Sequence, residues 1–546
     1  MRIALALLLI FALASLDMSH AFAAESGPWN QVSREALRGH TEFLADDLLE
    51  GRAAATRGYD LAAAYVAAQF RQYGLKPAGD AETFFQSVPL VEATPVLPGS
   101  SARLVLDEDT IDFEYGTDYL PSADYSSASS TLTAPLVFAG YGIDAPELGH
   151  NDFENIEVEG RIAVILTGAP AKFPNNQRAY YSSYLRKSSM LTEKGAVGTI
   201  TIDSLVDARR MPWERVVAMS WAPQMRWLDA QGNPQDAFPE LKLRFRFKQE
   251  SAAALFEHGP VSLAEALEKA DAGEPQGFEL PGMMTLSATT GLRRTESANV
   301  LGMLPGSDPT LRREYVVVSA HLDHLGRGSS VDGDSIYNGA HDNAVGIAML
   351  LEIARALESA RVKPKRSIVF AAVTAEEKGL LGSAFMAHAA QLQEQAIVAN
   401  INIDMPLTLT RTRDFVAFGA EHSTLGAAAR NAAAAEGLRL SPDPTPEEVV
   451  FVRSDQFSFV RSGIPALMLH TGNIPRDEAI DLPALRRAFF EEHYHRPSDD
   501  LTLPIDYEAA ADLTRIHLRI LLEAANGARP RWRRGDFFGE KFGESE

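Results

Sequence analysis

From about residue 290 onward, short apolar runs alternate with longer stretches of helical spacing. The apolar runs lack polar alternation, which is typical of strands covered on both faces. They are Tyr315–Ala320, Ile368–Val373, Ile397–Ile403 and Ala466–Leu469. The stretches with helical periodicity are 344–357, 383–392, 425–435 and 509–522. This alternation predicts an α/β fold with a doubly wound, mostly parallel sheet.

The part of the chain before residue 290 has a different pattern. A chain of 546 residues is too long for one ordinary core, so two or three domains are expected. Residues 30–80 have helical spacing, whereas about 100–285 contain short β-compatible runs separated by turn-forming residues. The predicted organisation is a helical lead-in over 24–125, an inserted β-rich domain over 126–285, the principal α/β domain over 286–527 and a flexible tail over 528–546.

The composition excludes several classes of protein. Lys and Arg number 51 against 73 Asp and Glu, a formal charge of −22, which argues against a nucleic-acid partner. There is no cysteine, so disulfides, thiolate metal sites and cysteine nucleophiles are excluded together. Any bound metal must therefore be held by His, Asp and Glu.

The N-terminus has the pattern of a secretory signal peptide. Arg2 precedes the apolar run Ile3–Leu16, and Ala21-Phe22-Ala23 forms an A-x-A ending. The run is shorter than the ~20 apolar residues of a membrane span. We therefore predict a signal peptide over 1–23, export to the periplasm or the medium, and no stable membrane anchor.

Polar residues gather where the predicted strands end. They come directly after three of the four strands, and one further acid precedes the helical stretch at 344. These residues are His321, Asp323, Asp342, Glu376, Glu377 and Asp404. Open α/β sheets place their sites outside the carboxyl ends of the strands, so the six side chains are expected on one common rim.

Crowded carboxylates repel one another, and burying them costs several kcal/mol unless cations neutralise them. The acids Asp342, Glu377 and Asp404 carry −3 beside two neutral imidazoles. Two divalent ions (+4) and a bridging hydroxide (−1) bring that charge to zero, which favours a two-metal site with ions ~3.5–4 Å apart. A His and carboxylate donor set suits zinc.

His321 supplies one imidazole, and a second is needed. His495 is the favoured residue, in a loop before the last helical stretch. Spacing alone does not choose it over the other histidines, so four alternatives stay open. They are His324, His341, His470 and His493.

Each acid also has an ordinary structural interpretation. Asp323 is a plausible loop acid, Glu376-Glu377 a plausible solvated pair, and Asp342 a plausible helix cap. The metal-site hypothesis depends on their joint placement at the strand ends and not on any one of them.

These motifs resemble the co-catalytic zinc aminopeptidases, metallopeptidase family twenty-eight. The segments that carry the resemblance are Ser319–Gly326, Asn338–Ala344, Thr374–Ser383, Asn402–Met405 and Tyr494–Asp499. Phe43–Arg52 also resembles the lead-in of exported members. Phe138–Gly142 and Val158–Ile165 resemble their inserted protease-associated (PA) domain, so the similarity extends over roughly residues 33–525.

The resemblance implies a ligand set. His321 and Asp404 would bind one metal ion, Glu377 and His495 the other, and Asp342 would bridge both.

The resemblance also implies roles for three further residues. Glu376 would be the general base, Asp323 would steer His321, and Tyr494 would polarise the scissile carbonyl. A cis peptide bond would come after the bridging acid Asp342. One departure is Gln456, which stands where the family often has His.

The implied function is that of an exported two-zinc aminopeptidase, which removes N-terminal residues from peptides with a free N-terminus through a metal-bridging hydroxide. Three alternatives stay open: a carboxypeptidase of the same fold, a glutaminyl cyclase, and a non-catalytic peptide-binding protein on this scaffold. The native metal, the preferred N-terminal residue and the oligomeric state do not follow from the sequence.

Overall fold

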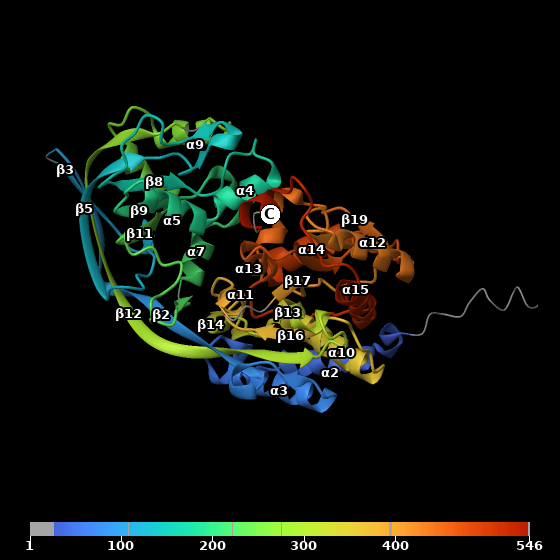
Figure 1. Ribbon diagram of the computed structural model, residues 1–546. Helices are drawn as coiled ribbons and strands as arrows, with labels where there is room; N and C mark the ends of the chain where they lie inside the picture. The colour runs from blue at the N-terminus through green and yellow to red at the C-terminus, as the bar shows by residue number, and fades with distance from the viewer. Residues whose placement is uncertain (1–26, 108, 221, 275, 393–395, 544–546) are drawn as a thin grey trace, which may run out of the picture.

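The computed structural model describes residues 27–543 except 108, 221, 275 and 393–395 (Figure 1). The predicted signal peptide over 1–23 lies outside the described residues. Within the described residues, no helix has the length and apolar character needed to cross a bilayer.

The principal domain is built on a mostly parallel sheet, as the alternation of strands and helices predicts. Its four central strands run parallel to one another, and an antiparallel strand flanks them on each side. In spatial order the strands are β19 (Arg439–Ser441), β18 (Asp414–Phe418), β20 (Ala466–Thr471), β17 (Ala396–Asn402), β13 (Glu314–His321), β16 (Ser367–Val373) and β12 (Phe278–Leu304).

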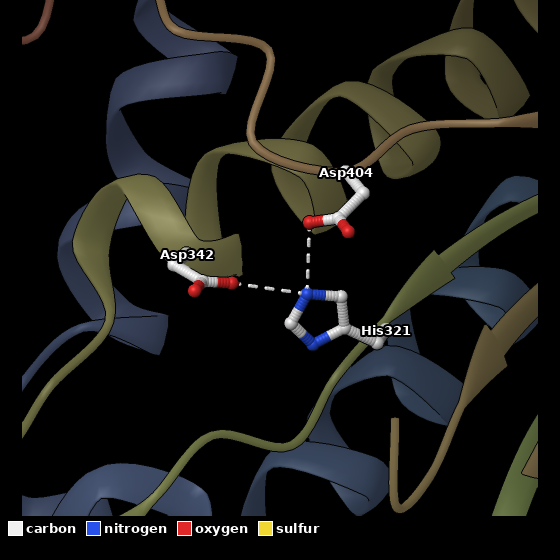
Figure 2. A group of neighbouring side chains, drawn as sticks. All are labelled: His321, Asp342 and Asp404. Carbon is white, nitrogen blue, oxygen red and sulfur yellow. Dashed lines mark hydrogen bonds and ion pairs between the residues drawn. The ribbon is translucent and has the colours of Figure 1, made fainter. Parts of the chain in front are cut away.

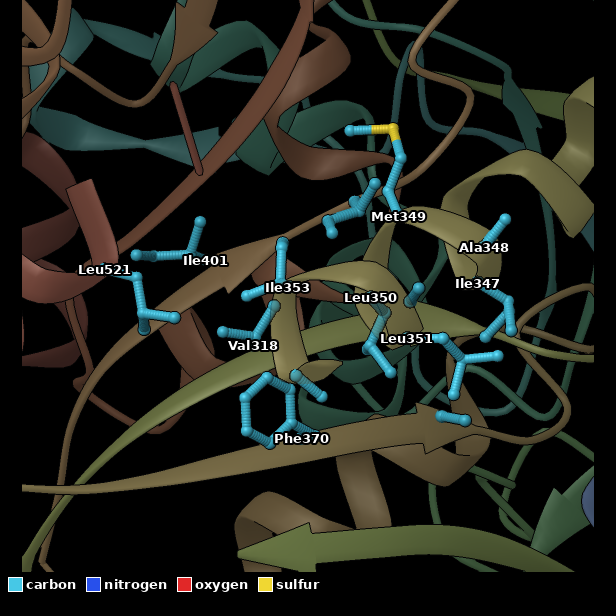
Figure 3. Packing of buried hydrophobic residues seen from close by; sticks show 14 of the residues in the cluster. Val318, Ile347, Ala348, Met349, Leu350, Leu351, Ile353, Phe370, Ile401 and Leu521 are labelled. Atoms are coloured by element: carbon cyan, nitrogen blue, oxygen red, sulfur yellow. The ribbon is translucent and has the colours of Figure 1, made fainter. Parts of the chain in front are cut away.

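Helices cover both faces of this sheet, so the doubly wound α/β prediction is confirmed. Val316 and Val318 of β13 pack into the large apolar cluster of one face, part of which is drawn in Figure 3. Val317 packs into the cluster of the opposite face, as expected for a strand with period two. The first cluster includes residues of α2 (Arg34–Leu44), α3 (Arg57–Tyr73), α10 (Val345–Ser359), α12 (Leu425–Glu436) and α15 (Tyr507–Asn526). The second includes residues of α11 (Leu381–Leu392) and α13 (Gln456–Arg461).

The inserted unit is a second α/β body. Four of its strands are parallel neighbours, and a fifth closes the edge antiparallel. These strands are β5 (Ser129–Phe138), β8 (Ile162–Leu166), β9 (Gly198–Ile202), β11 (Leu243–Phe247) and β4 (Tyr119–Pro121). The helices of this unit are α4 (Asn175–Ser182), α5 (Tyr184–Glu193), α6 (Leu205–Arg210), α7 (Trp213–Met219), α8 (Gln249–Ala252) and α9 (Leu263–Asp271). The unit is therefore less purely β than expected, because helices fill the intervals between its strands.

One long strand joins the two bodies. β12 pairs with β5 of the inserted unit over Phe278–Thr289 and with β16 of the principal sheet over Val300–Leu304. β2 (Phe85–Leu106) pairs with β12 across the intervening length, and the two form the curved band in Figure 1. The predicted boundary at 285/286 thus falls inside β12, and the helical part of the lead-in ends at Tyr73.

The segment expected to be a flexible tail is packed against the principal domain over residues 528–543. Phe538, in α16 (Phe537–Phe542), has no exposed surface and contacts Phe451 and Phe457. Trp532 donates from Nε1 to the carbonyl of Gly463 at 2.8 Å. Buried aromatic side chains therefore hold down a segment whose charged composition had suggested fraying.

Candidate metal centre

Three side chains from three separate segments meet at the carboxyl end of β13. His321 is the last residue of that strand, and its Nε2 lies 3.1 Å from Oδ1 of Asp342 and 3.0 Å from Oδ1 of Asp404. Asp342 lies in the helical turn before α10, and Asp404 lies two residues beyond the end of β17. Figure 2 shows both carboxylates directed at the same imidazole nitrogen.

A second group forms around the other oxygen of Asp342. His495 Nε2 lies 3.3 Å from Asp342 Oδ2 and 3.2 Å from Oε2 of Glu377. The two oxygens of Asp342 therefore face two different histidines. This is the arrangement expected of a carboxylate that lies between two bound ions.

The structure also places the four alternative histidines. His324 joins the second group, with Nδ1 2.7 Å from Glu377 Oε1. His470 directs Nε2 at the main-chain carbonyl of Asp404, at 3.1 Å. His341 packs edge-on against Phe489, and His493 contacts the hydroxyl of Ser498. The predicted His495 and one of the alternatives, His324, thus both reach the cluster.

The contact between Asp323 and His321 differs from the one expected. His321 Nδ1 lies 3.0 Å from the main-chain carbonyl of Asp323 and not from its carboxylate. The carboxylate instead accepts from the backbone N–H groups of Glu376 at 3.1 Å and Glu377 at 3.3 Å. Asp323 therefore fixes the backbone of both glutamates, while its carbonyl orients the imidazole.

Glu376 and Tyr494 border the cluster. Burial raises the pKa of Glu376 well above its ordinary value, and the charge of His321 opposes this shift. The Tyr494 ring stacks on the His495 ring, with centroids 3.9 Å apart and planes 28° apart. Burial also raises the pKa of Tyr494 well above 10, and nearby carboxylates add to the effect. Its phenol is therefore held protonated.

The excess of acids dominates the electrostatics of the site. Burial alone would lower the pKa of His495, but Glu377 and Asp342 raise it to about 10. The same balance raises the pKa of His321, where Asp404 is the principal partner. The carboxylates thus hold protons on both imidazoles. A divalent cation would displace these protons, because ligand imidazoles bind metal in the neutral form.

Two residues that the sequence reasoning did not single out support the ligand loops. Arg52 is 1% exposed, and its guanidinium donates to four main-chain carbonyls. The acceptors are Leu322 (3.0 Å), Asn338 (2.6 Å), Gly339 (3.2 Å) and Leu44. Asp499 accepts from the backbone N–H groups of His341 at 2.9 Å and Asp342 at 3.1 Å. Both residues lie in segments that carry the family resemblance, but no spacing rule indicates these contacts.

The donor set and its spacing fit zinc. Two ligands of one tetrahedral zinc ion, each at about 2.0–2.1 Å, lie roughly 3.3 Å apart. The four contacts made by His321 and His495 are 3.0–3.3 Å. The expected cis peptide bond is present between Asp342 and Asn343. Gln456, the departure from the family pattern, accepts from Asn402 and donates to the Phe451 carbonyl, so it serves the core and not the cluster.

Fold and cluster together define a class: α/β proteins with paired His and carboxylate groups at the carboxyl ends of a parallel sheet. Residues 299–521 match the model described as Peptidase family M28. This segment contains all five expected ligands, and its match agrees with the family resemblance that the motifs carry.

The chain is also similar to individual proteins. It is 37% identical over 139 residues to "Aminopeptidase NAALADL1" of Mus musculus, which is 24% of this chain and 17% of that protein. It is 38% identical over 106 residues to a "Probable zinc metalloprotease" of Pyrenophora teres f. teres (strain 0-1), or 19% of this chain and 22% of that protein. The matches thus span about a fifth of these curated relatives. A solved "Aminopeptidase from Aneurinibacillus sp. strain AM-1" has the same fold, with a TM-score of 0.53 and 19% identity over 92% of this chain and 96% of that one.

Proposed function

We propose that the protein is an exported, metal-dependent aminopeptidase that uses two zinc ions to hydrolyse the N-terminal peptide bond of peptides. One observation carries the proposal. The two carboxylate oxygens of Asp342 face two separate imidazoles, His321 and His495, and each imidazole also faces a further acid. In this assignment Asp404 completes the first ion's ligands and Glu377 the second's.

Bound zinc would polarise the scissile carbonyl and lower the pKa of water at the site. Glu376 is assigned as the general base, which takes a proton from the attacking water and delivers it to the leaving amine. Its buried carboxylate has a raised pKa, which suits a group that both accepts and releases a proton. Tyr494, held protonated beside His495, is assigned as a donor to the carbonyl oxygen.

The acid-rich cluster also supports exopeptidase specificity. The two ions and the hydroxide balance Asp342, Glu377 and Asp404, which leaves the carboxylate of Glu376 to favour a free α-ammonium group, whereas a blocked N-terminus brings no compensating charge. This favours substrates with a free N-terminus over internal peptide bonds.

The proposal includes two further assignments. Residues 1–23 are assigned as a signal peptide that directs export, and the inserted unit is assigned as a PA domain. The inserted unit contacts the site loop, since Arg215 of α7 donates from Nη2 to the main-chain carbonyl of Tyr494 at 3.2 Å. This contact supports a place for the unit beside the path of the substrate.

The test combines metal analysis with turnover of leucine p-nitroanilide and its N-acetylated form. We expect two zinc ions per chain, turnover of the free-amine substrate only, and loss of both metal and turnover in a chelator. Glu376→Gln should keep both ions and lose at least ~100-fold in kcat. The matched control is Glu478→Gln, whose side chain is 81% exposed and which should behave as wild type. Equal turnover of the N-acetylated substrate, or full activity in Glu376→Gln, would refute the assignment.

A further inference from the structure

His324 has no role in the ligand set expected from the family, yet it is buried in the metal cluster. Its side chain is 0% exposed, and neither ring nitrogen has a hydrogen-bond partner among the residues that the structure describes. Leaving a polar group buried without a partner costs roughly 1–3 kcal/mol. An imidazole in this state therefore needs an explanation.

The position of the ring points to a ligand. The two oxygens of Glu377 each face an imidazole, Oε2 that of His495 at 3.2 Å and Oε1 that of His324 at 2.7 Å. The two histidine rings pack edge to face, with centroids 5.8 Å apart. His324, Asp342 and Glu377 each offer one ligand atom, and these three atoms lie within 4.8 Å of one another. These are the same two acids that His495 contacts.

Two explanations fit the short contact with Glu377. If Nδ1–H simply donated to Oε1, His324 would position the carboxylate from outside the metal shell. The geometry favours a ligand instead, because Nδ1 and Oε1 lie 2.7 Å apart without the alignment of a good hydrogen bond in the described chain. Both atoms approach closely without aiming at each other, which is how two ligands of one ion are arranged.

We propose that His324 is a sixth metal ligand, which binds the second ion through Nδ1 beside Glu377, Asp342 and His495. The inference rests on the two-metal function proposed above. It makes the two ions unequal: the first has one imidazole and two carboxylates, and the second has two imidazoles and two carboxylates. With a water molecule the second ion would be five-coordinate, a number that catalytic zinc adopts.

The first test counts imidazoles in the wild-type protein loaded with two zinc ions. X-ray absorption at the zinc edge should give three imidazole ligands per two ions, whereas the family's ligand set gives two. A count of two would overturn the inference and leave the peptidase assignment intact. A chain that binds no zinc would overturn both.

The second test separates a ligand from a hydrogen-bond donor. In His324→Asn the amide nitrogen lies near the position of Nδ1, so the variant keeps a donor to Glu377 but loses a good zinc ligand. We expect zinc affinity at one of the two sites to fall more than ~100-fold, beyond the 10–100-fold that loss of an outer partner produces. The other site should change little, and chelator competition measures both.

His341→Asn is the matched control. His341 is equally buried, lacks a side-chain partner for both ring nitrogens within the described part of the chain, and precedes Asp342 directly, but it packs against Phe489. The control should keep both zinc affinities within ~10-fold of wild type. Wild-type affinity in His324→Asn, or equal losses in both variants, would overturn the inference.

Discussion

Arg52 provides a sharp test of how the ligand loops are held. It lies in the lead-in, outside the segment that matches the family model, and donates to four main-chain carbonyls. Two of these, Asn338 and Gly339, directly precede the turn that carries Asp342, and a third, Leu322, comes directly after His321. Replacing Arg52 by Met leaves three of these buried acceptors without a donor, because the Gly339 carbonyl also accepts from the backbone N–H of Ala344 at 3.1 Å.

The size of the effect can be worked out from this count. At about 1 kcal/mol for each of the three unsatisfied carbonyls, the low end of the usual range, Arg52→Met should lower the free energy of unfolding by about 3 kcal/mol. Loss of the cation adds to this, because Asp323, Asp499 and Asp342 all interact with its charge. Arg52→Lys keeps the charge but lacks the planar fork of donors, so about 1–2 kcal/mol is expected.

Urea unfolding in excess chelator measures these differences without a contribution from bound metal. The control is Arg57→Met, an exposed arginine at the start of α3, which should stay within about 0.5 kcal/mol of wild type. We expect Arg52→Met to have the lowest free energy of unfolding, Arg52→Lys an intermediate one and the control Arg57→Met the highest. If Arg52→Met unfolded at the same urea concentration as the control, the bonding role of the guanidinium would be refuted.

Other contacts in the molecule lead to three further predictions. Asp499→Asn should weaken zinc binding about 10–100-fold, because Asp499 accepts from the backbone of His341 and Asp342; chelator competition measures this, and the more exposed neighbour variant Asp500→Asn should show no change. Phe538→Ala should cost about 3–5 kcal/mol in urea unfolding, since this side chain is fully buried, and an unchanged midpoint would contradict the packed C-terminal segment. Burial lowers the pKa of His517 to about 4. Below about pH 6.5 the unfolded chain therefore binds a proton that the folded protein excludes. The stability of the wild type falls as a result when the pH drops towards 4. The deficit of His517→Gln relative to wild type should therefore be about 2 kcal/mol smaller at pH 5 than at pH 7, and an equal deficit at both pH values would count against this reasoning.

The sequence predicted the framework of the site because strand ends are encoded locally. The runs before His321, Glu376 and Asp404 are mainly apolar, so the sheet places these three side chains on one rim. Charge counting suggested two ions, and the family resemblance alone suggested Asp342 as the bridging acid. The sheet order around β13 then brings the expected ligands within 3.0–3.3 Å of their partners.

The features that the sequence could not predict depend on loop backbones and long-range packing. His324 and His341 stand in motifs of similar composition, Ser319–Gly326 and Asn338–Ala344. The backbone path of each loop decides which of the two side chains turns towards the acids, and the sequence does not reveal that path. Three of the four bonds of Arg52 join residues 270 to 287 positions apart, beyond any local pattern. The carbonyl contact of Asp323 similarly depends on a backbone turn that spacing does not reveal.

The continuity of β12 has a consequence for how the molecule can be divided and moved. A single 27-residue strand supplies hydrogen bonds to both sheets, so excising the inserted unit at a sequence boundary would leave an unpaired edge on each fragment. A continuous paired strand, and not a flexible linker, connects the two bodies. Any movement of the inserted unit away from the principal sheet must therefore bend β12 along its length.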